Sequence, residues 1–169
     1  MNIRSWRYKD IDEIVDMMVD FSREESKCDL LNGNLNRSRN ITTGIITHLH
    51  NGSIELLVAE ENDRLAGYTL LNRDHPEYTK ALVIEEIFTK PQYRRRGIAR
   101  RFTESAIEYA KKNRIKELYT EVRERNIANT KNNQKLGFTI KARDRRGDSY
   151  YLLFRKYIDT ARLIEEVDQ

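Results

Sequence analysis

The chain has 169 residues, which suits a single domain. Hydrophobic residues make up 38% of it and charged residues 34%, so we expect one core beneath a heavily charged surface. The formal net charge of +4 permits contact with nucleic acid or phosphate ligands without implying it. One cysteine, Cys28, excludes an internal disulfide, and the chain has neither a signal-peptide pattern nor an apolar run of membrane-spanning length. We therefore expect a cytoplasmic protein without a membrane contact.

The N-terminal third predicts one short strand and two helices. Residues 1–6 are strand-like, and Asp10 can then cap a helix, with Glu13 completing a capping-box-like pair. Apolar residues follow at helical spacing: Ile11, Ile14, Val15 and Met18. Residues 22–36 show no clear period and are expected to be irregular. A second helix is predicted over 37–50.

Three strand-like segments and a long helix come next. Residues 53–61 and 65–73 are separated by a short polar break, which predicts an antiparallel hairpin. A third strand over 81–89 ends at Lys90-Pro91. A helix is predicted over about 96–113, with these residues facing inward: Ile98, Phe102, Ala106 and Ala110.

The last third predicts a strand over 115–122, a short helix over 126–136 that ends at Gly137, and a closing hairpin around 146–148. The whole order is β-α-α-β-β-β-α-β-α-β-β. It indicates an α+β fold with a mixed, mostly antiparallel central sheet flanked by helices. Strands 81–89 and 115–122, with the helix between them, fit one parallel unit. We expect a single domain over 1–157 and an extension over 158–169 that can form one or two helical turns.

The sequence "QYRRRGIAR" at 92–100 places several cations at a predicted helix start. Cations are normally unfavourable there, because the macrodipole already makes that end positive. Gly97 and Ala99 in the first turn would let a ligand approach the backbone, where unpaired N–H groups can hold a phosphate. The run therefore indicates an anionic ligand such as a pyrophosphate, and a solvated basic face remains the alternative. Neither a P-loop nor a G-x-G-x-x-G motif occurs.

Two longer segments carry a family resemblance. "IEEIFTKPQYRRRGIARRF" resembles the acetyl-CoA-binding segment of the GNAT superfamily of N-acetyltransferases, with Arg94, Gly97 and Ala99 at the patterned positions. "TEVRERNIANTKNNQKLGF" resembles the second block of the family, in which the matching residues are Asn126, Lys135, Gly137 and Phe138. With the first strand and helix included, the resemblance covers roughly residues 2–157.

The resemblance implies an enzyme that transfers an acetyl group directly from acetyl-CoA to an amine. The cofactor-binding residues that it implies are Ile87, Phe88, Thr89, Arg94, Arg95, Arg96, Gly97, Ile98, Ala99, Arg100, Asn126, Asn129 and Asn133. The strand at 87–89 would pair with the pantetheine arm, and the N–H of Phe88 or Thr89 would stabilise the developing oxyanion. Asn126 can also cap a helix. No metal is expected, since His48 and His50 lie on different faces of a predicted helix.

The attacking amine must lose a proton before it reacts. Reaching the neutral form at pH 7 costs about 4.6 kcal/mol for a lysine-type amine and about 1.4 kcal/mol for an α-amine. Glu85, Glu86 and Glu121 are the candidate bases, and we favour Glu85, with Glu121 next. Glu85-Glu86 resembles the acidic pair of spermidine/spermine acetyltransferases, and Glu121 matches a glutamate of ribosomal-protein alanine acetyltransferases. Each can instead be a strand-edge carboxylate paired with an arginine.

The general acid is where the sequence departs from the family pattern. Many members carry a tyrosine seven residues after the patterned asparagine, and this chain has Asn133 there. An amide cannot act as the acid, although it can donate a hydrogen bond to the sulfur. Tyr150, Tyr151 or water could replace it. The departure leaves a second function open, a non-catalytic acyl-CoA-binding or sensor module.

The acceptor is not identified by the sequence. A polyamine, a small amine or a protein amine would fit, and residues 22–40 and 144–148 would shape the choice. Nucleic acid is not expected as a partner, because the basic run lacks interleaved aromatic residues. A homodimer through the last strands or the tail remains open. His75 lies in a polar loop and is expected to be exposed to solvent.

Overall fold

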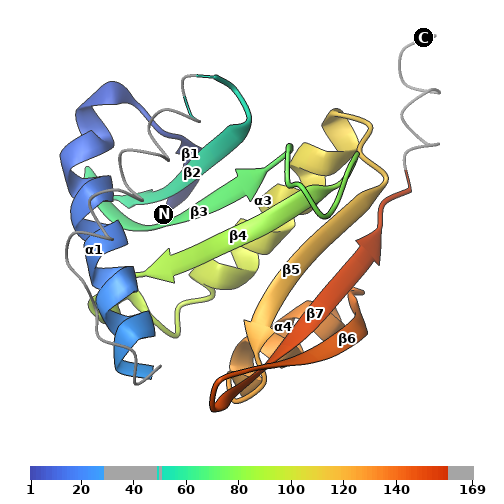
Figure 1. Cartoon of the computed structure of the whole chain (residues 1–169). Coiled ribbons are helices and arrows are strands. Elements are labelled where there is room, and N and C mark those ends of the chain that lie inside the picture. The colour runs from blue at the N-terminus through green and yellow to red at the C-terminus, as the bar shows by residue number, and fades with distance from the viewer. Residues whose placement is uncertain (29–48, 50, 160–169) are drawn as a thin grey trace, which may run out of the picture. The chain divides into compact units, whose positions relative to one another are not determined.

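The computed structural model describes residues 1–28, 49 and 51–159, so the predicted helix at 37–50 and most of the C-terminal extension lie outside the described residues. The described strands are β1 (Asn2–Ser5), β2 (Ile54–Glu61), β3 (Arg64–Asn72), β4 (Leu82–Thr89), β5 (Glu117–Arg123), β6 (Thr139–Arg146) and β7 (Ser149–Tyr157). The helices are α1 (Ile11–Cys28), α3 (Ile98–Lys112) and α4 (Ile127–Lys135), with short 3-10 turns at Tyr8–Asp10 and Pro91–Tyr93 (Figure 1).

The strands form a seven-stranded sheet in the order β1-β2-β3-β4-β5-β7-β6. β1 is antiparallel to β2, β5 is parallel to β4, and β7 is antiparallel to both β5 and β6. The predicted α+β class with a mixed sheet is therefore confirmed, and so is the parallel pairing of the strands on either side of the long helix.

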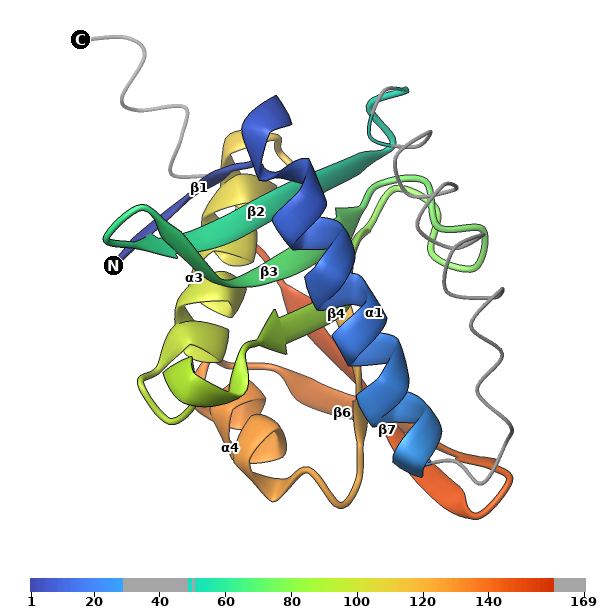
Figure 2. The ribbon, with the colours of Figure 1, turned by 90° about the vertical axis from the view of Figure 1, so that its left-hand side faces the viewer.

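The chain forms two compact units, each described below by itself. The first comprises Met1–Leu70 and Glu86–Phe102, and the second Leu71–Glu85 and Thr103–Gln169. In the first unit, α1 lies across β2 and β3 (Figure 2). The core contains Ile14, Met17 and Met18 of α1 with Leu56, Val58, Leu65, Tyr68, Leu70 and Phe88 of the strands. Burial of one such side chain contributes about 1.5–3 kcal/mol, so this interface anchors the helix on the sheet.

Helix α1 differs from its prediction in two respects. It continues to Cys28, so the expectation of irregular structure is wrong for residues 22–28. The segment "SREESK" lacks an apolar stripe, but its glutamates, arginine and lysine are good helix formers and extend a helix that is already nucleated. The predicted pairing of Asp10 with Glu13 is not found among the described contacts, because the N–H of Asp10 donates to Arg7 O and Glu13 forms an ion pair with Lys90.

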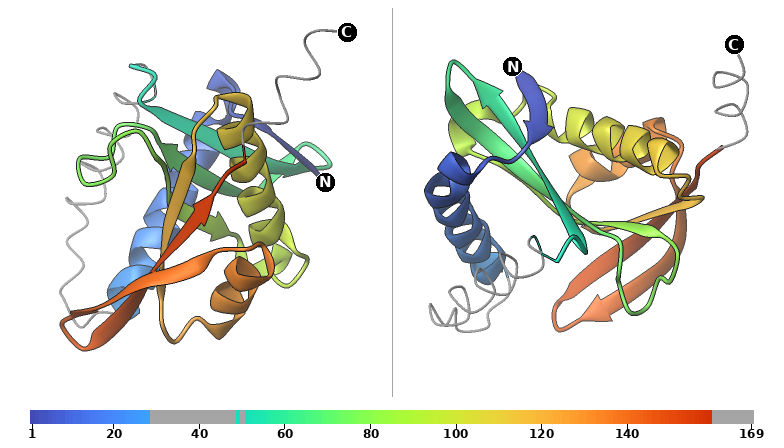
Figure 3. Two further views of the ribbon diagram at one scale, coloured as in Figure 1. Left: turned by 90° about the vertical axis from the view of Figure 1, so that its right-hand side faces the viewer. Right: turned by 90° about the horizontal axis from the view of Figure 1, so that it is seen from above.

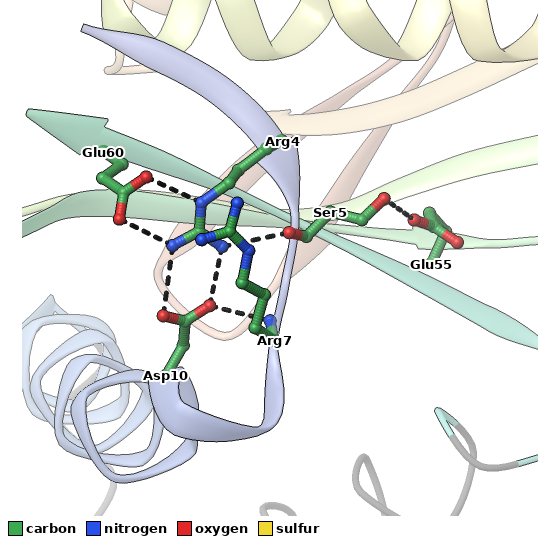
Figure 4. Close-up of polar contacts among 6 residues, drawn as sticks. All are labelled: Arg4, Ser5, Arg7, Asp10, Glu55 and Glu60. Atoms are coloured by element: carbon green, nitrogen blue, oxygen red, sulfur yellow. Dashed lines mark hydrogen bonds and ion pairs between the residues drawn. The ribbon is translucent and has the colours of Figure 1, made fainter. Parts of the chain in front are cut away.

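Asp10 belongs instead to a network around Arg4 (Figure 4). The Arg4 guanidinium donates two hydrogen bonds to Glu60, at 2.8 and 2.9 Å, and two to Asp10, at 2.7 and 3.1 Å. The backbone N–H of Arg7 adds a 2.7 Å bond to Asp10. Beside this network, Ser5 donates a hydrogen bond to Glu55. Because Arg4 lies on β1, the network joins that strand to β2 and to the start of α1.

The Arg4 hydrogen bonds change the acidity of both carboxyls. They lower the pKa of Asp10 and of Glu60, and these two partners in turn raise the pKa of Arg4. Arg4 and Asp10 are nearly buried, with side-chain exposures of 9% and 6%. Loss of one partner would therefore leave an uncompensated charge in a mostly dry position.

In the second unit, β5, β7 and β6 lie side by side, and the β6–β7 hairpin closes the sheet (Figure 3). The turn of this hairpin contains Gly147 in a left-handed conformation, with φ 58°. The parallel register of β4 and β5 runs from Leu82 opposite Leu118 to Ile84 opposite Thr120. Ala106 and Ala110 of α3 are fully buried, as the helical spacing predicted.

We expect Asp10→Asn to remove a pH-dependent part of the stability. The pKa of Asp10 lies below its ordinary value of 3.8, chiefly because of the Arg4 hydrogen bonds. The interaction is therefore fully present above about pH 4 and is lost as the pH falls through the folded-state pKa. Urea unfolding at pH 7, 5, 4 and 3 should show the free energy of unfolding falling more steeply below pH 4 in the wild type than in Asp10→Asn. Asp12→Asn, a neighbouring change on α1, is the control and should follow the wild type, and equal slopes in all three proteins would contradict the prediction.

Candidate active site

The basic run lies in a turn between the 3-10 turn Pro91–Tyr93 and helix α3. Arg95 and Gly97 both adopt left-handed conformations in it, with φ 63° and 78°. A Cβ built on Gly97 would meet no atom within 4 Å, so open space lies in front of this backbone. At this end of the helix, the N–H of Arg101 donates to Gly97 O at 3.1 Å. An α-helix leaves the N–H groups of its first turn outside its own hydrogen-bond ladder, so the start of α3 offers donors near this open space.

The four arginines near the turn are not equivalent. Arg94 donates to the Thr89 carbonyl at 2.9 Å and forms a bidentate pair with Glu24 at 2.6 and 2.8 Å. Arg96 bonds to Glu61 at 2.7 Å. Arg95 is exposed and has no side-chain partner among the described residues, and Arg100 is exposed on the first turn of α3. Arg95 is thus the guanidinium of the run best placed to receive an added anion.

The end of β4 is held very close to β3. A Cβ at Gly67 would lie 2.3 Å from the Phe88 carbonyl oxygen, so this approach requires a residue without a side chain. Lys90 N donates to Ala66 O at 2.9 Å just beyond it. Phe88 is buried, and Thr89 Oγ1 is buried without a hydrogen-bond partner among the described residues. The segment Ile87–Thr89 therefore packs closely against β3 and carries a buried hydroxyl that has no partner in the described part of the chain.

The adjacent acidic residues of β4 have different surroundings. Glu86 accepts a 2.7 Å hydrogen bond from the hydroxyl of Tyr68, which is fully buried in the core of the first unit. Burial, then the charge and hydrogen bond of Glu86, raise the pKa of Tyr68, which remains protonated and donates. This hydrogen bond to a core residue gives Glu86 a structural role.

Glu85 belongs to the second unit and keeps a more open carboxylate. Its Oε1 accepts a 2.8 Å hydrogen bond from Asn72 and lies 3.8 Å from Nε2 of His75. No Lys or Arg pairs with it in the part of the chain that the structure describes. Its side chain is 33% exposed, so solvent or a substrate can reach it.

Glu121, also in the second unit, is paired with an arginine. Arg146 donates to both of its oxygens, at 2.7 and 2.6 Å. Arg146 therefore occupies both oxygens of this carboxylate, so an acceptor amine would have to displace it to reach either one. Of the two candidate bases that the sequence favoured, Glu85 is therefore the better placed.

Aromatic rings surround this acidic region of the second unit. Tyr78 stacks on Tyr119 with ring centroids 4.5 Å apart and lies 4.9 Å from the ring of His75. Burial, together with the charges of Glu77 and Glu121, raises the pKa of Tyr78. Sequence reasoning treated His75 as a solvent-exposed loop residue, whereas its side chain is only 21% exposed. No pattern in the sequence indicated this contact, because it depends on how the loop folds back on β4.

Helix α4 carries the three asparagines expected to contact the cofactor. Asn126 caps the helix by accepting a 3.1 Å bond from Asn129 N. Four buried polar atoms of this helix lack a hydrogen-bond partner among the described residues: Asn129 Oδ1, Thr130 Oγ1, Asn132 Nδ2 and Asn133 Nδ2. Asn133 is only 1% exposed. Leaving such groups unpaired costs about 1–3 kcal/mol each, so a polar ligand that satisfied them would be favoured. Within the second unit these orphaned atoms fit a ligand rich in amides, and within the first unit the open turn at Gly97 fits a phosphate. Acetyl-CoA carries both kinds of group.

The comparisons with known proteins identify the family of the chain. The acetyltransferase (GNAT) family matches residues 15–138 of the chain, which therefore belongs to this family of acetyl-CoA-dependent enzymes. No curated protein matches the chain in sequence.

Several solved structures are similar in fold. Ribosomal-protein-alanine N-acetyltransferase from Brucella melitensis superposes with a TM-score of 0.76 at 18% identity, over 94% of this chain and 100% of its own. yncA from Salmonella typhimurium, solved with its cofactor acetyl-CoA, gives 0.76 at 17% identity, over 94% of both chains. PaiA N-acetyltransferase from Thermoplasma acidophilum, in complex with coenzyme A, gives 0.68 at 17% identity, over 90% of this chain and 96% of its own. At these identities the likeness concerns the fold.

Two further features of the described residues bear on the early expectations. No described helix is both long and apolar enough to span a membrane. Within residues 1–28, 49 and 51–159, no group of three or more His, Cys, Asp or Glu side chains could hold a metal ion. His48 and His50 lie outside the described residues.

We expect Gly67→Ala to displace the end of β4 and to destabilise the protein. The added Cβ would stand 2.3 Å from a backbone oxygen that has no rotamer with which to move away. Overpacking of this kind costs about 1–3 kcal/mol, measurable as a lower urea midpoint. Gly52→Ala is the control, since its Cβ would meet nothing within 4 Å and only its φ of 72° is unfavourable. If Gly67→Ala proves no more destabilising than Gly52→Ala, the close approach does not constrain β4.

Proposed function

We propose that the chain acetylates a primary amine, which attacks acetyl-CoA directly in a ternary complex. The observation that carries the proposal is the left-handed turn at Arg95–Gly97, with open space before the helix and one guanidinium without a partner among the described residues. The pyrophosphate of acetyl-CoA would bind there, and the backbone of Ile87–Thr89 would receive the pantetheine arm. Arg94, Arg96, Ala99 and Arg100 would border the phosphates, and an N–H of Phe88 or Thr89 would face the thioester oxygen.

The chemistry needs two protons removed from the acceptor nitrogen and one delivered to the sulfur. Glu85 takes the first proton from the acceptor ammonium, directly or through water, and Glu121 is the second candidate for this role. The neutral amine nitrogen then bonds to the carbonyl carbon of the thioester, and it loses its second proton to water as the carbon–sulfur bond breaks. The products are the N-acetyl amine and the CoA thiolate, which takes a proton to become the free thiol.

Asn133 would assist the leaving group without acting as an acid. Its Nδ2 is buried and lacks a partner among the described residues, so it can donate a hydrogen bond to the sulfur or to the pantetheine arm. Asn126 and Asn129 would contact the cofactor beside it. The proton for the thiolate would come from Tyr150, Tyr151 or water. The acceptor would be a polyamine, another small amine or a protein amine.

The same asparagine supports a second candidate, an acyl-CoA-binding module without catalysis. An amide in place of a tyrosine supplies hydrogen bonds but no acid. Steady-state release of CoA thiol with a panel of primary amines separates the two functions. Acetyl-CoA binding without amine-dependent release would favour the binding module.

Acetyl-CoA should stabilise the wild type, and Arg95→Ala should reduce this effect. A ligand at 100 times its dissociation constant adds about 2.7 kcal/mol of stability. We expect Arg95→Ala to weaken binding about tenfold and Gly97→Asp to weaken it more, because a carboxylate would repel the phosphates. Isothermal titration and thermal unfolding measure both effects. Arg64→Ala, at an exposed arginine on β3, is the matched control, and equal binding by Arg95→Ala and Arg64→Ala would refute the location of the phosphate site.

Glu85→Gln should slow turnover without weakening acetyl-CoA binding. Removal of a general base typically lowers kcat by about 10²–10⁴-fold. Glu121→Gln should lower it by less than about tenfold, since Arg146 already occupies that carboxylate. Steady-state kinetics with the best acceptor of the panel give both values. A larger loss in Glu121→Gln would reverse the assignment of the base.

A further inference from the structure

The loop that joins β3 to β4 folds back on the start of β4 (Figure 1). Asn72, at the end of β3, accepts a 2.9 Å bond from Asp74 N with its Oδ1. Its Nδ2 donates the 2.8 Å bond to Glu85 Oε1. Because both ends of the amide are used, its orientation is fixed, and the side chain joins the loop to the acidic residue of β4.

His75 approaches the same carboxylate from the loop. Its Nδ1 accepts a 3.2 Å bond from the backbone N–H of Glu77, so a neutral ring must carry its proton on Nε2. That nitrogen lies 3.8 Å from Glu85 Oε1, within electrostatic contact but beyond a hydrogen bond. The ring also lies 4.9 Å from Tyr78, which in turn stacks on Tyr119 of β5. Backbone and ring contacts together hold the imidazole.

Both side chains act on one oxygen of Glu85. Asn72 and His75 approach Oε1, whereas Oε2 has no partner within the described part of the chain. A carboxylate fixed at one oxygen presents the other in a defined direction. Orientation of a reacting group in this way lowers the entropy cost of the proton transfer.

We propose that Asn72 and His75 are positioning residues, which hold Glu85 by Oε1 so that Oε2 receives the proton of the acceptor amine. The inference rests on the proposed function, in which Glu85 is the general base. It adds that the loop between β3 and β4 forms part of the catalytic arrangement, a role that the sequence did not indicate. The two residues contact Glu85 and not the cofactor, so they should affect turnover and leave cofactor binding unchanged.

The test compares variants of the full chain with acetyl-CoA and a panel of alkyl amines, diamines and peptides with a free N-terminus or lysine. The amine with the highest wild-type rate serves as the probe. His75→Ala and Asn72→Ala should each lower kcat about tenfold, with an unchanged KM for acetyl-CoA. His75→Gln should recover most of the loss, because its amide can donate toward Oε1. Asp74→Ala in the same loop is the matched control and should stay within about twofold of the wild type.

A second set of variants separates positioning from general damage to the fold. In a Glu85→Gln background, His75→Ala should cause no further loss, since there is no longer a base to position. Equal losses with and without Glu85 would overturn the inference, as would a His75→Ala rate equal to that of the wild type. Unchanged thermal unfolding and acetyl-CoA affinity show that the variants are folded, and a lower kcat explained by a lost fold would count against the proposal.

The outcomes also separate this inference from the proposed function. Amine-dependent CoA release by the wild type with no effect of His75→Ala or Asn72→Ala would leave the acetyltransferase proposal standing and refute the positioning role. A wild type that binds acetyl-CoA but releases no CoA thiol with any amine of the panel would refute both.

Discussion

The close backbone approach of β3 to β4 is the constraint on which the first unit depends. Gly67 lets the Phe88 carbonyl lie where any other residue would place its Cβ. From that point the chain has little freedom, because Lys90 N bonds to Ala66 O and Arg94 binds the Thr89 carbonyl. The left-handed turn and the start of α3 follow directly. A glycine on β3 thus helps to fix where the turn before α3 begins.

The charges of the basic run have two separate tasks. Arg94 and Arg96 reach Glu24 and Glu61, which lie far away in the sequence, and each pair ties the turn to another element of the first unit. Each exposed ion pair contributes little to the free energy of unfolding. Together, the two pairs link the turn to α1 and β2. Arg95, in a left-handed conformation, makes no such pair among the described residues. The sequence alone presents these arginines as one cluster, whereas the fold assigns them to different roles.

Local patterns predicted most of the described elements, and tertiary contacts account for the errors. The apolar spacing of Ile98, Phe102, Ala106 and Ala110 identified α3, since a helix that packs on a sheet must show such a stripe. The same criterion predicted that α1 ends earlier than it does, because the last part of the helix is polar and has no apolar stripe. In the site, family-like spacing indicated the turn at Gly97 and the acidic candidates. It could not indicate His75, whose approach to Glu85 depends on a loop that no periodic pattern describes.

The three acidic candidates differ in what already occupies their oxygens. Glu86 accepts a hydrogen bond from the hydroxyl of the buried Tyr68, and Glu121 accepts hydrogen bonds from Arg146 at both oxygens. Glu85 accepts one hydrogen bond at Oε1, from the neutral amide of Asn72, and His75 lies 3.8 Å from the same oxygen. A neutral amide donor orients a carboxylate without cancelling its charge, while a bidentate guanidinium does both. A base must keep its charge, its exposure and its direction together, and among these three carboxylates the surroundings of Glu85 best combine them.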